Sequence, residues 1–164
     1  MPGQEVPINS FNISFNNDDD KFRSIACAVK DPTSIVSHQQ YPGFSVVQVS
    51  KQPLEYGLCI GILYRKQTNS LADFYDYLSI LIETWHIDIL LGDFNINYFD
   101  SEDFCNRALS DFTMIVTEAT HIDGALLDHV YVRKQLLATV NVVPLVKHVF
   151  YSDHDIVKIK LSKN

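Results

Sequence analysis

The sequence predicts an α/β sandwich. Short apolar runs typical of strands recur along the chain, and one longer segment, residues 71–85, has the period of a helix. Several of the strand-like runs follow one another without a helix between them. A regular alternation of strand and helix would indicate a doubly wound parallel sheet, so the sequential strands favour the sandwich.

The length and composition of the chain fit one domain. The chain has 164 residues, of which 46% are hydrophobic, and this is enough for a buried core. Residues 1–21 are rich in Asn, Asp and Ser and predict an irregular segment, so the domain is expected over residues 22–164. The apolar runs are too short to span a bilayer, and the first ten residues contain no signal-peptide core. We therefore expect an intracellular protein that is neither secreted nor membrane-bound.

The net charge and the cysteines narrow the range of functions and environments that fit this chain. The formal net charge of −7 opposes general attraction to a phosphate backbone, so contact with DNA has to be local or assisted by a metal. The three cysteines show no paired spacing. Cys27 and Cys59 lie in apolar runs, which predicts buried free thiols.

Three strands are expected in the first half of the chain. Ser24–Val29 has the composition of a buried strand, and Phe44–Val49 follows it after the turn signal Pro42-Gly43. Their spacing indicates a meander. Leu58–Tyr64 is apolar throughout, as expected for a strand that is covered on both faces.

A helix is expected over Leu71–Trp85, because its apolar residues lie three or four positions apart. Ser70 is a natural N-cap, and the carboxylate of Asp73 favours the helix N-terminus. The spacing predicts two sets of residues, a buried one of Leu71, Phe74, Leu78, Leu81 and Trp85, and an exposed one of Asp73, Asp76 and Glu83.

The second half is expected to consist mainly of strands. A strand over Asp88–Leu91 ends at Gly92, and a short helix follows over Ser101–Asp111. The remaining strand-like runs are Thr113–Thr117, Asp128–Val132, Val140–Val146 and Asp155–Leu161.

The segment Ile89–Asn95 brings an acid and an amide to the end of an apolar strand. Strand alternation aims the side chains of Asp93 and Asn95 the same way. Such a pair can bind a hard cation through oxygen, or orient a water beside a phosphate. The same residues also suit an Asx turn, in which they only cap their own backbone, and this segment alone leaves both interpretations open.

Two further polar clusters stand at strand ends. Asp128 begins a strand, while His129 points to the opposite face and is expected to be structural. Tyr151–Asp155 leads into the last strand, and His154, which stands between two acids, suits a general base, a phosphate ligand, a metal ligand or a titrating surface residue. Because the loops of an α/β sandwich gather at strand ends, we expect the three clusters to meet in one cleft.

These segments resemble a known family. In chain order, Gly92–Asn95, Leu127–Val130 and Ser152–His154 are similar to the three C-terminal motifs of the endonuclease/exonuclease/phosphatase superfamily. Leu63–Arg65, with the helix after it, resembles the tyrosine motif of that family. The likeness runs over residues 22–161 and is nearest to the apurinic-endonuclease-like nucleases of non-LTR retrotransposons and Helitron elements. It implies a four-layer α/β sandwich of the DNase-I-like type.

The resemblance also implies a role for each site residue. Asp93 would activate or orient the attacking water, and Asn95 would hydrogen-bond that water or the scissile phosphate. His154 would contact the phosphate or act as base, and which of His154 and Asp93 takes the proton stays open. Asp128 would accept a hydrogen bond from His154 and fix its tautomer. Tyr64 would donate its hydroxyl to a phosphate oxygen.

A metal ion is implied as cofactor. The implied ligands are Asp93, Asn95 and Asp153, and Mg²⁺ (or Mn²⁺) is expected because this set offers oxygen alone. The principal metal ligand of the family, a glutamate at the end of an early strand, has no counterpart. Glu5 follows no apolar strand, and Glu55 stands in the middle of the chain.

From that missing glutamate we expect a sandwich that is incomplete at the N-terminus and impaired in catalysis. Loss of the first strands would expose a sheet edge, which a partner chain or self-association would cover. Three functions stay open. They are a metal-dependent phosphodiesterase of the endonuclease kind acting on DNA, a catalytically inactive mobile-element remnant or binding module, and a phosphatase of a small phosphoester.

Overall fold

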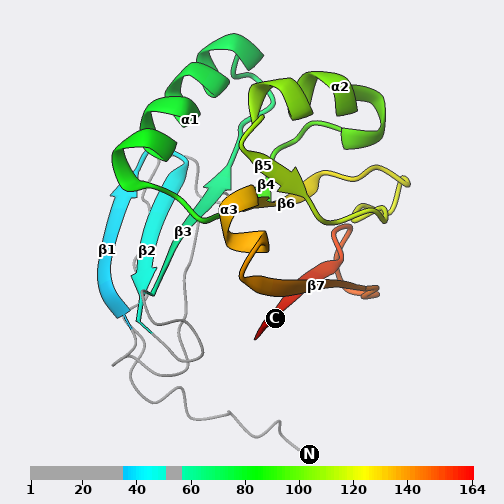
Figure 1. Ribbon diagram of the computed structural model, residues 1–164. Coiled ribbons are helices and arrows are strands. Elements are labelled where there is room, and N and C mark those ends of the chain that lie inside the picture. The colour runs from blue at the N-terminus through cyan, green and yellow to red at the C-terminus, as the bar shows by residue number, and fades with distance from the viewer. Residues whose placement is uncertain (1–34, 51–56) are drawn as a thin grey trace, which may run out of the picture.

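The computed structural model describes residues 35–50 and 57–164 (Figure 1). The helices are α1 (Leu71–Trp85), α2 (Tyr98–Ala108) and α3 (Lys134–Leu137). The strands are β1 (Ile35–Tyr41), β2 (Phe44–Val49), β3 (Leu58–Tyr64), β4 (Ile89–Asp93), β5 (Phe112–Met114), β6 (Asp128–Arg133), β7 (Val140–Lys147) and β8 (Ile156–Lys163).

Two sheets and a helical layer make up the described part of the chain. Six strands form one sheet in the order β1-β2-β3-β4-β6-β5, and β7 pairs with β8 in the other. Helices α1 and α2 cover one face of the large sheet, and the β7–β8 pair packs on its other side (Figure 1). The predicted α/β sandwich is confirmed, with three of its layers in the described residues.

Each face of the large sheet has its own core. Leu90 and Tyr131 point toward α1 and α2, whereas their neighbours Ile89 and Val130 point toward β7 and β8. This alternation follows from the two-residue period of a strand. It also explains why β4 is apolar from Ile89 to Leu91, since a strand covered on both sides has no face left for water.

The first half of the sheet confirms two predicted strands. The bounds of β2 and β3 are those that the apolar runs predict, and the two strands pair antiparallel. The predicted strand Ser24–Val29 and its Cys27 lie outside the described residues. Strand β1 was not predicted, because Ile35–Tyr41 is largely polar, and it forms by antiparallel pairing with β2 at the edge of the sheet.

Helix α1 has the predicted bounds. Ser70 caps it, with its hydroxyl accepting a bond from the backbone N–H of Asp73 at 3.4 Å. Phe74, Leu78 and Leu81 are buried as predicted. The three acids Asp73, Asp76 and Glu83 are exposed, also as predicted.

Two positions of α1 depart from the predicted buried set. Leu71 is 38% exposed, because the first residue of the helix lies beyond the packed turns, and Tyr75 is buried instead. Trp85 is half-buried at the other end. Its indole N–H donates to the hydroxyl of Tyr41 at 2.9 Å, which ties α1 to strand β1.

The helix predicted at Ser101–Asp111 starts and ends earlier than expected. Helix α2 begins at Tyr98, and a kink at Ser101 (φ −132°, ψ 15°) divides it. It ends before Leu109 because Phe112 is buried in the core as the first residue of strand β5. Strand β5 is shorter than predicted.

Among the described residues, Cys59 and Cys105 are buried free thiols, and α1, the longest helix at 15 residues, falls short of what a membrane span requires.

Candidate active site

Three site residues stand in a row across neighbouring strand ends. Tyr64 on β3 pairs in parallel register with Asp93 on β4, and Asp93 pairs in turn with Asp128 on β6. Residues paired in this way project from the same side of a sheet, on strands about 4.8 Å apart. The row shares its face with Leu91 and Val130, which belong to the core between the sheets. It therefore lies on the side where β7 and β8 pack.

Gly92 allows this row to form. Its φ is 143°, and a Cβ at this position would run into the carbonyl oxygen of Leu63. Only glycine therefore lets β3 and β4 approach so closely at the residue before Asp93.

The Asx turn considered for this segment is present. One carboxylate oxygen of Asp93 accepts the backbone N–H of Asn95 at 2.8 Å, and the other accepts its amide nitrogen at 3.3 Å. The same amide nitrogen donates to the carbonyl of Arg65 at 2.7 Å, and Asn95 has a left-handed φ of 48°. The turn orients the carboxylate of Asp93. It also engages both amide hydrogens of Asn95, so Asn95 can donate to a phosphate only by exchanging one of these bonds.

Arg65 stabilises this turn through hydrogen bonds to backbone carbonyls. Its guanidinium is buried and donates to the carbonyls of Phe94 and Asn95 at 3.4 and 3.2 Å, and to that of Asn69 at 2.6 Å. Arg65 belongs to the segment that resembles the tyrosine motif, and the sequence predicted no role for it. Its bonds all go to backbone oxygens, which no local pattern reveals.

The predicted pair of His154 and Asp128 is formed. Nδ1 of His154 lies 2.8 Å from a carboxylate oxygen of Asp128. Because a carboxylate only accepts, the proton sits on Nδ1, and Nε2 is left for another partner. Burial alone would lower the pKa of His154, but the hydrogen bond and charge of Asp128, with the charges of Asp93 and Asp153, raise it above its ordinary value.

A buried threonine holds the two halves of this pair together. The hydroxyl of Thr120 accepts the backbone N–H groups of Leu127 and Asp128 at 3.1 and 3.0 Å. Its carbonyl accepts the N–H of Asp155 at 2.8 Å, just beyond His154. Thr120 was not singled out in the sequence, since a lone threonine in a loop carries no motif of its own.

His121, the next residue, was also missed. Its ring lies 5.0 Å from the ring of His154, and its Nε2 lies 3.8 Å from a carboxylate oxygen of Asp153. Within residues 35–50 and 57–164, one set of three His, Cys, Asp or Glu side chains has its ligand atoms within 4.8 Å of one another. It consists of His121, Asp153 and His154. Asp93 stands outside that set.

The surroundings of Asp93 disfavour its charged form and raise its pKa. Its burial is the main cause of a raised pKa, and the neighbouring charge of Asp128 adds to it. The backbone N–H of Asn95 and the two histidines, His154 and His121, act in the opposite direction. A cation beside Asp93 would relieve both causes.

Tyr64 is half-buried at the other end of the row, and its hydroxyl has no hydrogen-bond partner among the described residues. That leaves the hydroxyl free to donate to a ligand.

His129 lies on the opposite face of β6, as predicted. It is fully buried, with Nε2 donating to the carbonyls of Ile96 and Leu126 at 2.9 and 3.1 Å. Its ring stacks on Phe94 at 4.5 Å. Burial is the main cause that lowers the pKa of His129 to about 4, so its role is structural.

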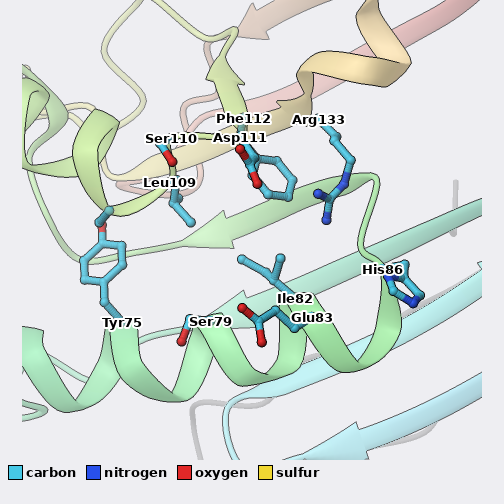
Figure 2. Close-up of a pocket in the computed structure, with 11 residues that line it drawn as sticks. Tyr75, Ser79, Ile82, Glu83, His86, Leu109, Ser110, Asp111, Phe112 and Arg133 are labelled. Atoms are coloured by element: carbon cyan, nitrogen blue, oxygen red, sulfur yellow. The ribbon is translucent and has the colours of Figure 1, made fainter.

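A cavity elsewhere contains none of these residues. It has a volume of about 280 Å³ and lies between α1 and the turn from α2 to β5 (Figure 2). Its lining includes Tyr75, Glu83, Asp111 and Arg133. The polar row at the strand ends is thus separate from it.

The fold has a relative among the solved structures. It is similar to the endonuclease domain of TRAS1, a telomere-specific non-LTR retrotransposon, with a TM-score of 0.65 at 12% sequence identity. The likeness covers 83% of this chain and 71% of that chain. It confirms the predicted DNase-I-like sandwich fold. No protein-family model and no curated protein sequence matches the chain.

Proposed function

We propose that this chain is a metal-dependent phosphodiesterase of the endonuclease kind that acts on DNA. The observation that carries the proposal is the His154–Asp128 pair, 2.8 Å apart, beside Asp93 at one end of the large sheet. A histidine whose tautomer is fixed by a carboxylate, next to a second carboxylate, is an arrangement for moving a proton and holding a phosphate. The fold it shares with a retrotransposon endonuclease domain supports the same class.

Each side chain then has a task. His154 presents Nε2 to the phosphate, since Asp128 occupies Nδ1. Asp93 orients the attacking water, and its raised pKa brings it closer to that of an effective base. His154 and Asp93 are thus the two groups that can take the proton. Tyr64 donates its hydroxyl to a phosphate oxygen, and Asn95 holds the carboxylate of Asp93 in place.

The donor set fits a hard cation such as Mg²⁺ or Mn²⁺. Asp93, Asn95 and Asp153 offer oxygen. Burial, together with the charge of Asp128, raises the pKa of Asp93, and a cation would lower it again. When bound, the ion supplies charge that stabilises the phosphate oxygens during cleavage. In the described part of the chain, Asp93 belongs to no group of three close carboxylates or imidazoles. We therefore propose weak binding of the ion and slow cleavage by this chain.

The β7–β8 hairpin supports DNA as substrate. Residues 140–163 carry four lysines and two aspartates, a formal charge of +2 on a chain whose total is −7. At the tip, Phe150 is 99% and Tyr151 71% exposed, with ring centroids 5.6 Å apart. Exposed aromatic rings beside lysines are suited to stacking on bases along a charged backbone. This tip leads directly into Asp153 and His154, so bound bases would lie next to the site.

Nicking of supercoiled plasmid DNA tests the proposal. We expect slow conversion to the open circle with Mg²⁺ or Mn²⁺, none with EDTA, and loss of nicking in His154→Ala. His148→Ala is the matched control, because His148 is an exposed histidine of the same hairpin that pairs with Asp155 and has no proposed role in cleavage.

Three results would contradict the proposal. Nicking that survives in His154→Ala would place the chemistry elsewhere. DNA binding without any nicking in Mg²⁺ or Mn²⁺ would indicate a binding module. Metal-dependent release of phosphate from a small phosphoester, with intact plasmid, would indicate a phosphatase.

A further inference from the structure

Two imidazoles and one carboxylate converge at the edge of the proposed nuclease site, with which they share Asp153 and His154. Donor atoms of His121, Asp153 and His154 all lie within 4.8 Å of one another. They come from two loops that backbone bonds hold side by side, with the N–H of Ile122 donating to the carbonyl of Asp153 at 2.8 Å, and His121 bridging to His154. The proximity of the three side chains is therefore built into the backbone.

Each of the two histidines has a carboxylate behind its ring. Nδ1 of His154 lies 2.8 Å from Asp128. Nδ1 of His121 accepts the backbone N–H of Asp123 at 3.3 Å and lies 3.5 Å from the carboxylate of the same residue. With a metal ion on Nε2, that carboxylate would accept the proton that moves to Nδ1. A carboxylate behind the ring is how metal-binding histidines are oriented and made more basic.

We propose that His121, Asp153 and His154 bind a borderline transition-metal ion, for which Zn²⁺ is the probe. Two imidazole nitrogens and a carboxylate suit Zn²⁺ rather than Mg²⁺, which prefers oxygen. Three protein ligands leave a fourth position open to water or a phosphate oxygen.

The three side chains can close on such an ion. At bond lengths of roughly 2.0–2.1 Å, tetrahedral ligand atoms lie about 3.3 Å apart, so the present spacing must shrink by at most about 1.5 Å. The side chain of Asp153 is 70% exposed and can rotate, while His121 is more enclosed at 17%. Rotation of Asp153 therefore supplies most of the movement.

The proposed site competes with the proposed nuclease. Bound Zn²⁺ would occupy Nε2 of His154 and take Asp153 from the Mg²⁺ set, so it would inhibit cleavage. This consequence rests on the proposed function, whereas binding of Zn²⁺ does not. Binding is accordingly measured first, without DNA.

Binding is tested on the tag-free full chain at fixed pH, with Co²⁺ as spectroscopic probe and Zn²⁺ as competitor. We expect one Co²⁺ per chain, with visible absorption typical of a four-coordinate site, displaced by Zn²⁺ and not by excess Mg²⁺. His121→Asn should weaken binding at least 100-fold, and Asp123→Asn by about 10-fold, in the range for a residue behind a ligand. His148→Asn, an exposed histidine outside the set, should bind as the wild type does.

Equal Zn²⁺ affinity in wild type, His121→Asn and His148→Asn would overturn the proposal, as would displacement of Co²⁺ by Mg²⁺. Circular dichroism establishes that the variants are folded, and His154→Asn provides a second loss of ligand. In the nicking assay, Zn²⁺ should inhibit the wild type at concentrations that leave His121→Asn unaffected. If neither protein nicks DNA, the proposed function fails while the Co²⁺ spectra still decide the metal site.

Discussion

His129 and His154 lie on opposite sides of the large sheet, and both are placed by strand β6. His129 belongs to the strand and points into the helical core, where two carbonyls accept its Nε2 proton. His154 reaches over the other face, where the carboxylate of Asp128 accepts its Nδ1 proton. Asp128 and His129 are neighbours in sequence, so strand alternation alone separates the two environments.

The balance between burial and the acceptor decides what each histidine can do. Burial lowers the pKa of His129 to about 4, against the smaller raising effect of its two carbonyl acceptors, and keeps the ring uncharged. For His154 the carboxylate outweighs the opposing effect of burial and raises the pKa. The first environment makes a histidine part of the core, and the second makes it available for chemistry.

The largest expected effect is on the rate of DNA cleavage, and it distinguishes His154 from His129. Under the proposed function, His154→Ala should lower the rate of DNA cleavage by about 10²–10⁴-fold, the usual contribution of a positioned acid or base. Its free energy of unfolding should change by less than about 1 kcal/mol, because the side chain is partly exposed. Single-turnover cleavage and urea denaturation measure the two. A His154→Ala protein that cleaves DNA at the wild-type rate would contradict a role for His154 in cleavage.

The opposite result is expected for His129. His129→Ala should reduce the free energy of unfolding by about 3–4 kcal/mol, because it leaves a cavity beside Phe94 and two buried carbonyls unpaired. Urea denaturation followed by circular dichroism gives the value. A loss below about 1 kcal/mol would show that the ring is not part of the core.

The pH dependence of stability should have opposite signs for the two residues. The folded-state pKa of His129 is lowered from 6.5 to about 4, so between these values the unfolded chain binds the extra proton. Its contribution is therefore lost as pH falls from about 6.5 to 4, by up to roughly 3 kcal/mol at about 1.4 kcal/mol a unit. The raised pKa of His154 contributes stability below about pH 6.5 that is lost as pH rises through its folded value.

His129→Phe isolates the larger of these two contributions, since it keeps a ring and removes the titration. The free energy of unfolding of the wild type minus that of His129→Phe, measured from pH 7 to pH 4, should decrease as the pH is lowered. A difference that stays constant over this range would contradict the assigned environment of His129.

The smallest expected effect is on the His154 ring itself. Asp128→Asn removes the charge and the carboxylate acceptor, so the pKa of His154 should fall toward the value that burial favours. The ring protons of His154 report the change in an NMR titration, with His148, which is paired with Asp155, as internal reference. Identical titration curves in both proteins would refute the pairing.

Several elements could be predicted from the sequence to the residue. Strands β2 and β3 and helix α1 have the predicted bounds, because each has a clear apolar period and a strong stop signal. The pairing of Asp128 with His154 was expected from the family resemblance and is confirmed. The metal ligands and the catalytic roles remain proposals, since they depend on groups that only a bound ion or substrate would bring together.

The missed features have a common cause. Strand β1 is polar and depends on backbone pairing with β2, which its own side chains do not signal. Thr120 and His121 gain their places from bonds to residues 127, 128, 153 and 155, beyond the reach of any local pattern. The direction of the Asn95 amide likewise depends on Arg65, thirty positions away.

By itself, the sequence determined most of the segments that become strands and helices and which polar residues stand at their ends, because periodicity and turn signals act over a few residues. The tertiary structure alone decided which of these ends meet. It placed Asp93 between Tyr64 and Asp128, put His129 on one face and His154 over the other, and set His121 beside Asp153. Such contacts depend on strand register and loop closure, which involve the whole sheet at once.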